Sequence, residues 1–306
     1  MSNHDKMELD LLEAYRKIRG RIAPEWAVHK ITPEYSEELV VPTIPFVGTH
    51  YGEQNKRILV YASAENLANY CTGRSTDRPW LDDDAQAENR HRKCFDNQEM
   101  QEKQANPVIP YVHCGPMETG LLLTAVMYIA EKLRIMNMDG LTPRDFCEYI
   151  CFGNYGKYSK ETPYQFAKRK GVSREQAKRI NIDYAGNETL MSASNEYIKA
   201  DIDILRPDYI ILPASMYKAA KSFIDEIKGT AVIIPIQQML AGNVHNHIAP
   251  NGRNHREYRK YQVEELHPAV RASYNGLTTV AMDKYLYVFG YLDAVLNSFT
   301  DTYFLS

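Results

Sequence analysis

Apolar positions along the chain change repeatedly between the period of a helix and the period of a buried strand. The clearest case alternates a helical pattern, an apolar run, a second helical pattern and a second apolar run, at 195–205, 209–212, 214–227 and 231–234. Pro207 separates the first two, because it lacks an N–H and biases its predecessor away from the helix. Elements alternating at such short intervals predict parallel strands joined by right-handed crossover helices.

The rest of the chain extends this pattern. Four buried strands are expected in total, near 57–62, 148–153, 208–212 and 231–235. Further helices are expected at Asp5–Ile18, at Leu121–Leu133 and over most of Leu277–Phe299, whereas four prolines make 19–56 extended. We therefore expect a single α/β domain over 1–306, a three-layer α/β/α sandwich with a four-stranded, mostly parallel sheet. Residues 1–56 form its N-terminal segment, and 277–299 close the sandwich.

Composition narrows the class of protein. Hydrophobic residues make up 44% of the 306 and charged residues 25%, which is typical of a soluble protein. The five cysteines contain no CxxC pair, so we expect reduced thiols, no metal and no cofactor. The charged N-terminus has none of the apolar core of a signal peptide, and no apolar run approaches a membrane span of about 18 residues. These features indicate a cytoplasmic protein without a membrane partner.

Charge is unevenly distributed, although the net charge is only −3. A polar insertion at 72–106 contains the mixed-charge run ENRHRK at 88–93, and it is expected to be either a solvated flap or a mobile lid. The segment 157–179 contains eight basic residues but only two acidic ones, Glu161 and Glu175, and tyrosines lie between them. The basic residues are Lys157, Lys160, Lys168, Arg169, Lys170, Arg174, Lys178 and Arg179. A second cluster consists of Arg253, His255, Arg256, Arg259 and Lys260.

Five segments, in their order along the chain, resemble the uracil-DNA glycosylase superfamily over roughly residues 57–255. They are ILVYASAEN, HCGPMETGLLLTAVMYIAEKL, ICFGNYGKYS, IDILRPDYIILPASMYKAA and VIIPIQQMLAGNVHNHIAPNGRNHR. The resemblance implies a parallel sheet with its site at the carboxyl ends of the strands, DNA as the partner, and release of uracil or a related damaged base. The sequence differs from the family at two positions that carry the chemistry. Ala64 stands where the family commonly has the Asp or Asn that positions water, and the histidine of the last motif is displaced to His245 or His247.

Cleavage of an N-glycosidic bond needs a positioned water, a stabilised base anion and a grip on the extruded base. Asn154 maps to the residue that reads uracil, since an amide offers both a donor and an acceptor; the alternative is a turn asparagine. Glu65 could orient water, or it could only interact with a helix terminus. The remaining base-binding candidates near the strand ends are Ser63, Asn66, Tyr70 and Tyr155.

His245 and His247 are candidates for hydrogen bonding to the departing base, although surface histidines or metal ligands would give the same spacing. Lys168, Arg169, Lys170, Arg253 and Arg256 are expected to contact phosphates, unless these basic segments are merely solvated. Two alternatives to a glycosylase stay open. One is a catalytically silent nucleic-acid-binding module of the same fold, and the other is a metal-dependent small-molecule hydrolase that uses the histidine loop. The oligomeric state is open too.

Overall fold

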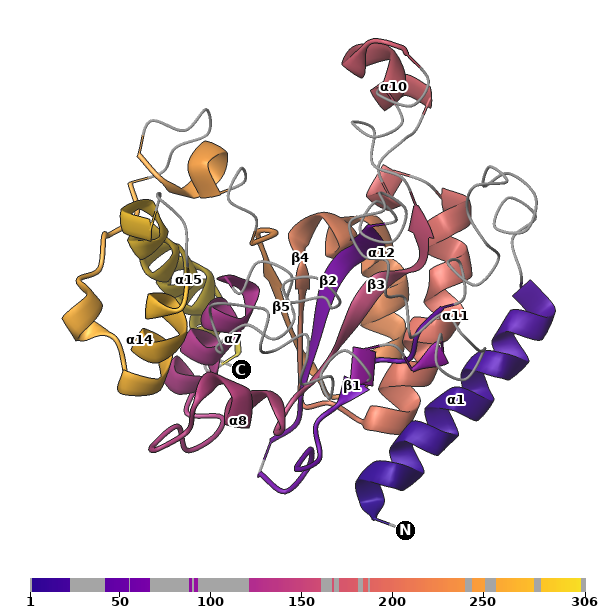
Figure 1. Ribbon diagram of the computed structural model, residues 1–306, viewed down its shortest axis with the longest axis horizontal. Coiled ribbons are helices and arrows are strands. Elements are labelled where there is room, and N and C mark those ends of the chain that lie inside the picture. The colour runs from indigo at the N-terminus through magenta and orange to yellow at the C-terminus, as the bar shows by residue number, and fades with distance from the viewer. Residues whose placement is uncertain are drawn as a thin grey trace, which may run out of the picture.

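A five-stranded sheet with helices on both faces forms the centre of the computed structural model (Figure 1). The structure describes residues 2–22, 42–54, 56–66, 88–89, 91–92, 121–160, 167, 171–180, 184–186, 188–239, 244–250, 257–277 and 282–303. The strands are β1 (Phe46–Val47), β2 (Ile58–Asn66), β3 (Cys151–Lys160), β4 (Tyr209–Pro213) and β5 (Val232–Ile236). The α-helices are α1 (Asn3–Ile22), α7 (Leu121–Lys132), α8 (Pro143–Cys147), α10 (Arg174–Ile180), α11 (Glu188–Leu205), α12 (Ala214–Ile227), α14 (Pro268–Asn275) and α15 (Met282–Tyr303). Three short turns are η3 (Tyr184–Gly186), the π-helical η4 (Val244–Ile248) and η5 (Val263–Glu265).

The strand order is β1-β3-β2-β4-β5, and β2 to β5 are parallel. The four predicted strands are therefore present, in a mostly parallel sheet. The predicted number of strands was too low, since β1 adds an antiparallel edge that pairs Phe46 with Phe152. The predicted start of β3 was too early as well. Thr142 and Asp145 form a reciprocal capping box, with Pro143 in the first turn, and so residues 143–147 become α8.

Two cores, one on each face of the sheet, explain the runs of consecutive apolar residues in the strands. Ile58 and Val60 of β2 pack into the first core, which α7, α8, α14 and α15 cover. Leu59 and Tyr61 pack into the second core, which α1, α11 and α12 cover. Successive side chains of a strand point to opposite faces, so a stretch buried on both faces is apolar at consecutive positions. The helices expected from the apolar period are present in both layers (Figure 1).

The connections between strands diverge at the middle of the sheet. The link from β2 to β3 runs through α7 on the first-core face, whereas the links through α11 and α12 run over the second-core face. The strands β2 and β4 are adjacent in the sheet. The chain leaves β2 over the first-core face and leaves β4 over the second-core face. In open α/β sheets, ligands bind outside the carboxyl ends of the strands at such a switch point.

The polar run at 88–93 does not form a solvated flap at the residues that the structure describes. Glu88 and His91 are only 2% and 1% exposed. The Glu88 carboxylate lies 2.7 Å from Arg16 Nη2 and 3.0 Å from Arg19 Nη2, both on α1. Its backbone carbonyl accepts a hydrogen bond from the Ile44 N–H at 2.9 Å. The prediction was wrong here because two arginines far away in sequence compensate the charge. The remainder of 72–106 lies outside the described residues.

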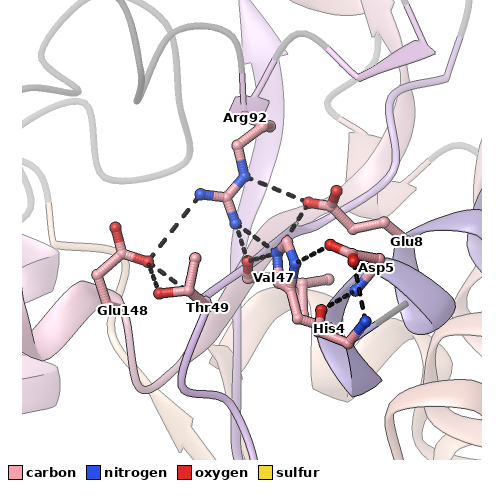
Figure 2. A network of polar contacts seen from close by, with 8 residues as sticks. His4, Asp5, Glu8, Val47, Thr49, Arg92 and Glu148 are labelled. Atoms are coloured by element: carbon pink, nitrogen blue, oxygen red, sulfur yellow. Dashed lines mark hydrogen bonds and ion pairs between the residues drawn. The ribbon is translucent and has the colours of Figure 1, made fainter.

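Arg92 ties the same segment to the edge of the sheet, as Figure 2 shows. Its guanidinium lies 4.2 Å from the centre of the Phe46 ring and donates to the Val47 carbonyl. The Arg92 Nε also donates to Glu8 of α1 at 3.3 Å. Glu148 lies 4.0 Å from Arg92 Nη1 and accepts a hydrogen bond from the Thr49 hydroxyl at 2.9 Å. A two-residue edge strand covered in this way offers little unpaired backbone to another chain.

Candidate functional site at the carboxyl ends of the strands

The last residues of β2 lie at the switch point, as predicted for a binding edge. Ala62 pairs with Asn154 of β3 and Ala64 pairs with Gly156. The register then shifts between Ala64 and Asn66, so the end of β2 is irregular. Irregular pairing of this kind often re-aims side chains beside a site. Glu65 belongs to this irregular end, although its side chain and that of Asn66 lie outside the described part.

Asn154 lies inside β3, whereas the sequence placed it at the tip of a strand ending at 153. The strand continues to Lys160, because residues 154–160 keep pairing with β2. The alternative of a turn asparagine is therefore also wrong. The side chain is 6% exposed and shares a strand face with Phe152 of the first core. An amide carries both a donor and an acceptor, so Asn154 brings hydrogen-bonding capacity to this face of the sheet.

The two predicted stacking residues are placed differently. Tyr155 is fully buried against α11, and its hydroxyl donates to Asn195 Oδ1 at 2.9 Å. Its ring meets the Tyr61 ring edge-on at 5.8 Å. The strand alternation explains this, since Tyr155 points to the second core and Asn154 to the first. Tyr155 is a packing residue in this arrangement, and Tyr70 lies outside the described residues.

The two candidate histidines lie on η4, which follows β5 and packs on α15. Val244 and Ile248 anchor η4 in the first core. His245 Nε2 is buried without a hydrogen-bond partner in the described structure, and its ring lies 6.5 Å from the Tyr285 ring. His247 is half-buried. Asn154 and η4 therefore lie on the same side of the sheet, that of the first core.

Ser63 adds a second unsatisfied polar atom to this edge. Its hydroxyl oxygen is buried without a partner among the described residues, although the residue as a whole is half-buried. A buried hydroxyl without a hydrogen bond costs about 1–3 kcal/mol. Unsatisfied atoms at Ser63 and His245, on the ends of β2 and after β5, are consistent with an edge completed by a bound molecule.

Lys157 is the clearest correction among the basic residues. It is 4% exposed, and its Nζ lies 2.7 Å from Asp201 Oδ2 of α11. The hydroxyls of Tyr61 and Tyr15 donate to the same carboxylate at 2.8 and 2.7 Å. Burial lowers the pKa of Lys157, and the Asp201 charge opposes that shift. Lys157 is thus part of an internal cluster rather than a phosphate contact.

Sequence reasoning missed this Lys157–Asp201 cluster, although a signal was present. Asp201 interrupts the apolar stripe of α11 between Ile198 and Ile202. A carboxylate on a buried stripe needs a buried partner, and Lys157 on the inward side of β3 supplies it. Charge counted along the chain cannot show that pairing.

The other predicted nucleic-acid contacts are only partly described. Lys168, Arg169, Lys170, Arg253 and Arg256 lie outside the described residues. Helix α10, which carries Arg174 and Glu175, stands beyond the sheet on the side where β3 ends (Figure 1). Both residues are exposed, so this segment can offer charge at the edge that carries the candidate site.

The fold is that of a mixed α/β protein with a mostly parallel sheet, and the candidate residues of β2 and η4 lie at or after the carboxyl ends of its strands. Neither family models, nor curated proteins, nor solved structures gave a match to this chain. The residues that the structure describes contain no group of three histidine, cysteine, aspartate or glutamate side chains arranged to hold a metal ion. The described cysteines, Cys147 and Cys151, are buried and form no disulfide. None of the described helices is long and apolar enough to cross a membrane.

Proposed function

We propose that this protein is a uracil-DNA glycosylase-like hydrolase that cleaves the N-glycosidic bond of uracil or a related damaged base in DNA. The proposal is supported by a sheet in which β2, the first of the four parallel strands, is flanked by β3 and β4. It is also supported by two polar atoms that are buried without a hydrogen-bond partner in the described structure, Ser63 Oγ in the last part of β2 and His245 Nε2 after β5. The expected four-stranded glycosylase-like sandwich is part of the same proposal, with β1 as an added edge strand.

The position of Asn154 is the observation that carries the proposal. The residue is 6% exposed and lies beside Ala62, one residue before the Ser63–Asn66 end of β2. An extruded pyrimidine presents a carbonyl oxygen and an N–H on one edge, and an amide matches both.

The remaining roles follow from position. Glu65, or Asn66 in its place, would orient the attacking water at the end of β2. His245 or His247 would hydrogen-bond the departing base, whose negative charge develops in the transition state. Glu65 belongs to the last residues of β2, and η4 follows β5. No metal or redox group is needed for these steps.

The test is base release from a uracil-containing oligonucleotide by the wild type and by Asn154→Ala, Glu65→Gln and His247→Ala. Three exposed residues provide controls of the same chemical change: Asn275→Ala, Glu226→Gln and His50→Ala. We expect release to fall by at least about 100-fold in each site variant, as for loss of a general base or of one electrostatic donor. The controls should keep wild-type rates. Equal rates in the site and control variants would remove these residues from the site.

A catalytically silent DNA-binding module is the second candidate. The specific observation is that Ala64 lies within β2, paired with Gly156, and brings no carboxylate or amide to the position where the family has one. This candidate predicts that the oligonucleotide shifts on a gel while no base is released at high protein concentration. The metal-dependent hydrolase alternative predicts instead that a chelator removes activity and that added zinc or manganese restores it.

A further inference from the structure

A cavity of about 350 Å³ opens at the edge of the sheet opposite to the candidate site. Lys6, Met7 and Asp10 of α1 line one wall. Arg57, just before β2, and Asp203 and Arg206, at the end of α11, line the other. The cavity therefore lies where the parallel strands begin, away from Asn154 and η4.

Cationic groups dominate the lining. Lys6, Arg57 and Arg206 contribute three side-chain cations, and none of the three makes a side-chain hydrogen bond or ion pair with another described residue. Of the two carboxylates, Asp203 is already paired with Lys199 at 2.7 Å. Asp208, which follows Arg206 closely, lies 3.5 Å from Lys56 Nζ. The lining therefore carries three cations against two carboxylates, of which Asp203 already has a cationic partner.

Arg206 adopts a backbone conformation in which glycine would be less strained. Its φ is +49°, in the left-handed region that follows many helices. Its N–H closes the last turn of α11 on the Ile202 carbonyl at 2.9 Å, so the backbone alone explains the helix end. The arginine side chain is therefore unnecessary for ending the helix, and it points a cation at the cavity.

Gly52 leaves room for the side chain of Arg57. Gly52 has a φ of +87°, and a side chain there would begin 3.1 Å from Arg57 Nε. The glycine thus lets the guanidinium lie directly on the turn at 51–53. The N-terminus of α1 is itself satisfied, because Ser2 and Asp5 cap each other's backbone N–H groups. The cationic character of the cavity consequently comes from its side chains.

We propose that this cavity binds a phosphate-bearing anion, with Arg57 and Arg206 as its principal contacts and Lys6 as a third. Guanidinium groups match phosphate oxygens in geometry as well as charge. Met7, which is buried, provides an apolar wall for the rest of the ligand. The ligand is either a free small anion or a phosphate of a nucleic-acid strand. The inference does not depend on the proposed glycosylase activity.

The experiment compares the wild type with Arg206→Gly and Arg134→Gly. Arg134 is a matched control, because it also follows a helix, has a φ of +50° and lies outside the cavity. Both changes relieve the same backbone strain and add the same flexibility to the unfolded chain, so the two variants should have similar thermal stability, close to that of the wild type. Pyrophosphate and a uracil-free single-stranded oligonucleotide are each titrated by calorimetry.

Loss of one charge-assisted contact should weaken binding by about tenfold or more in Arg206→Gly. Arg134→Gly should bind like the wild type. If Arg206→Gly weakens the binding of pyrophosphate, the ligand is a free anion. If it weakens only the binding of the oligonucleotide, the ligand is a phosphate of a nucleic-acid strand. Absence of binding by either probe at millimolar concentration, or equal affinities for the two variants, would overturn the proposal. Base-release activity is not read in this experiment, so its outcome is separate from that of the proposed function.

Discussion

Lys157 Nζ lies 2.7 Å from Asp201 Oδ2 in the interior between β3 and α11. The pair does not stand alone, since the Tyr15 hydroxyl from α1 and the Tyr61 hydroxyl from β2 donate to the same carboxylate. Four elements that are remote in sequence therefore meet at one buried charge. A buried ion pair contributes little net stability compared with apolar packing, but losing one partner leaves the other uncompensated.

The first prediction compares two aspartates on the same helix. Asp201→Asn should lower the free energy of unfolding by about 3–5 kcal/mol, because it leaves the buried Lys157 ammonium without an opposite charge. Asp203→Asn removes the exposed i,i+4 partner of Lys199 and should cost about 0.5 kcal/mol or less. Urea unfolding of both variants measures the difference. Similar losses in the two would mean that the Lys157–Asp201 pair is not a buried anchor.

A second prediction concerns alkaline pH. Burial, and after it the Asp201 charge, raise the pKa of Tyr15 and Tyr61 well above the usual value. Burial also raises the pKa of Tyr274 and of Tyr291 to about 12. Above a pH of about 10, tyrosines of the unfolded chain lose protons that the folded chain keeps, so stability falls as pH rises.

Each such tyrosine steepens that decline by up to about 1.4 kcal/mol per pH unit. Lys157 acts in the opposite sense, because its lowered pKa means that the folded chain loses this proton first. Its effect is confined to pH values below the usual lysine pKa, so the tyrosines should dominate between about pH 10 and 12. Denaturant titrations over that range, with tyrosinate absorbance as a second readout, measure the slope. A stability that stays flat from pH 10 to 12 would contradict the buried positions of these tyrosines.

The third prediction tests the contact between the polar insertion and α1. Glu88→Gln should cost about 1–2 kcal/mol, because Arg16 and Arg19 lose their charge-assisted contacts with a buried carboxylate, whereas the two arginines stay 50% and 33% exposed to water. Hydrogen exchange should also become faster in the second half of α1, where both arginines lie. Glu226→Gln, an exposed change on α12, provides the control. Unchanged exchange in α1 would show that Glu88 does not hold the segment against this helix.

A fourth prediction uses two helical glycines. A side chain at Gly290 of α15 would begin 2.2 Å from the Arg259 carbonyl oxygen, whereas one at Gly20 of α1 meets nothing within 4 Å. Gly290→Ala should therefore destabilise the protein by about 1–3 kcal/mol through overpacking. Gly20→Ala should stabilise it by up to about 1 kcal/mol, because alanine favours the helix. Thermal melts of the two variants should shift in opposite directions, and a shift of the same sign would refute the close approach of α15 to residue 259.

Several elements followed from local pattern alone. The strands β2, β4 and β5 and the helices α7, α11 and α12 were predicted within a few residues of their observed bounds. Their signal is the period of apolar side chains, which a segment carries by itself. Pro207 and the apolar run after it were enough to end α11 and begin β4. The edge of the sheet where a ligand would bind also followed from the order of these elements.

Other features were decided only by tertiary structure. The chain alone could not show that β3 continues past Asn154, because a strand ends where its neighbour stops pairing with it. Nor could it show that Glu88 and Lys157 are buried, since their compensating charges lie far away along the chain. A charged residue in a polar stretch has the same local pattern whether it faces water or an ion-pair partner. The spacing of apolar residues is a local property and could be recognised in the sequence. Charge compensation depends on which distant segments the fold brings together.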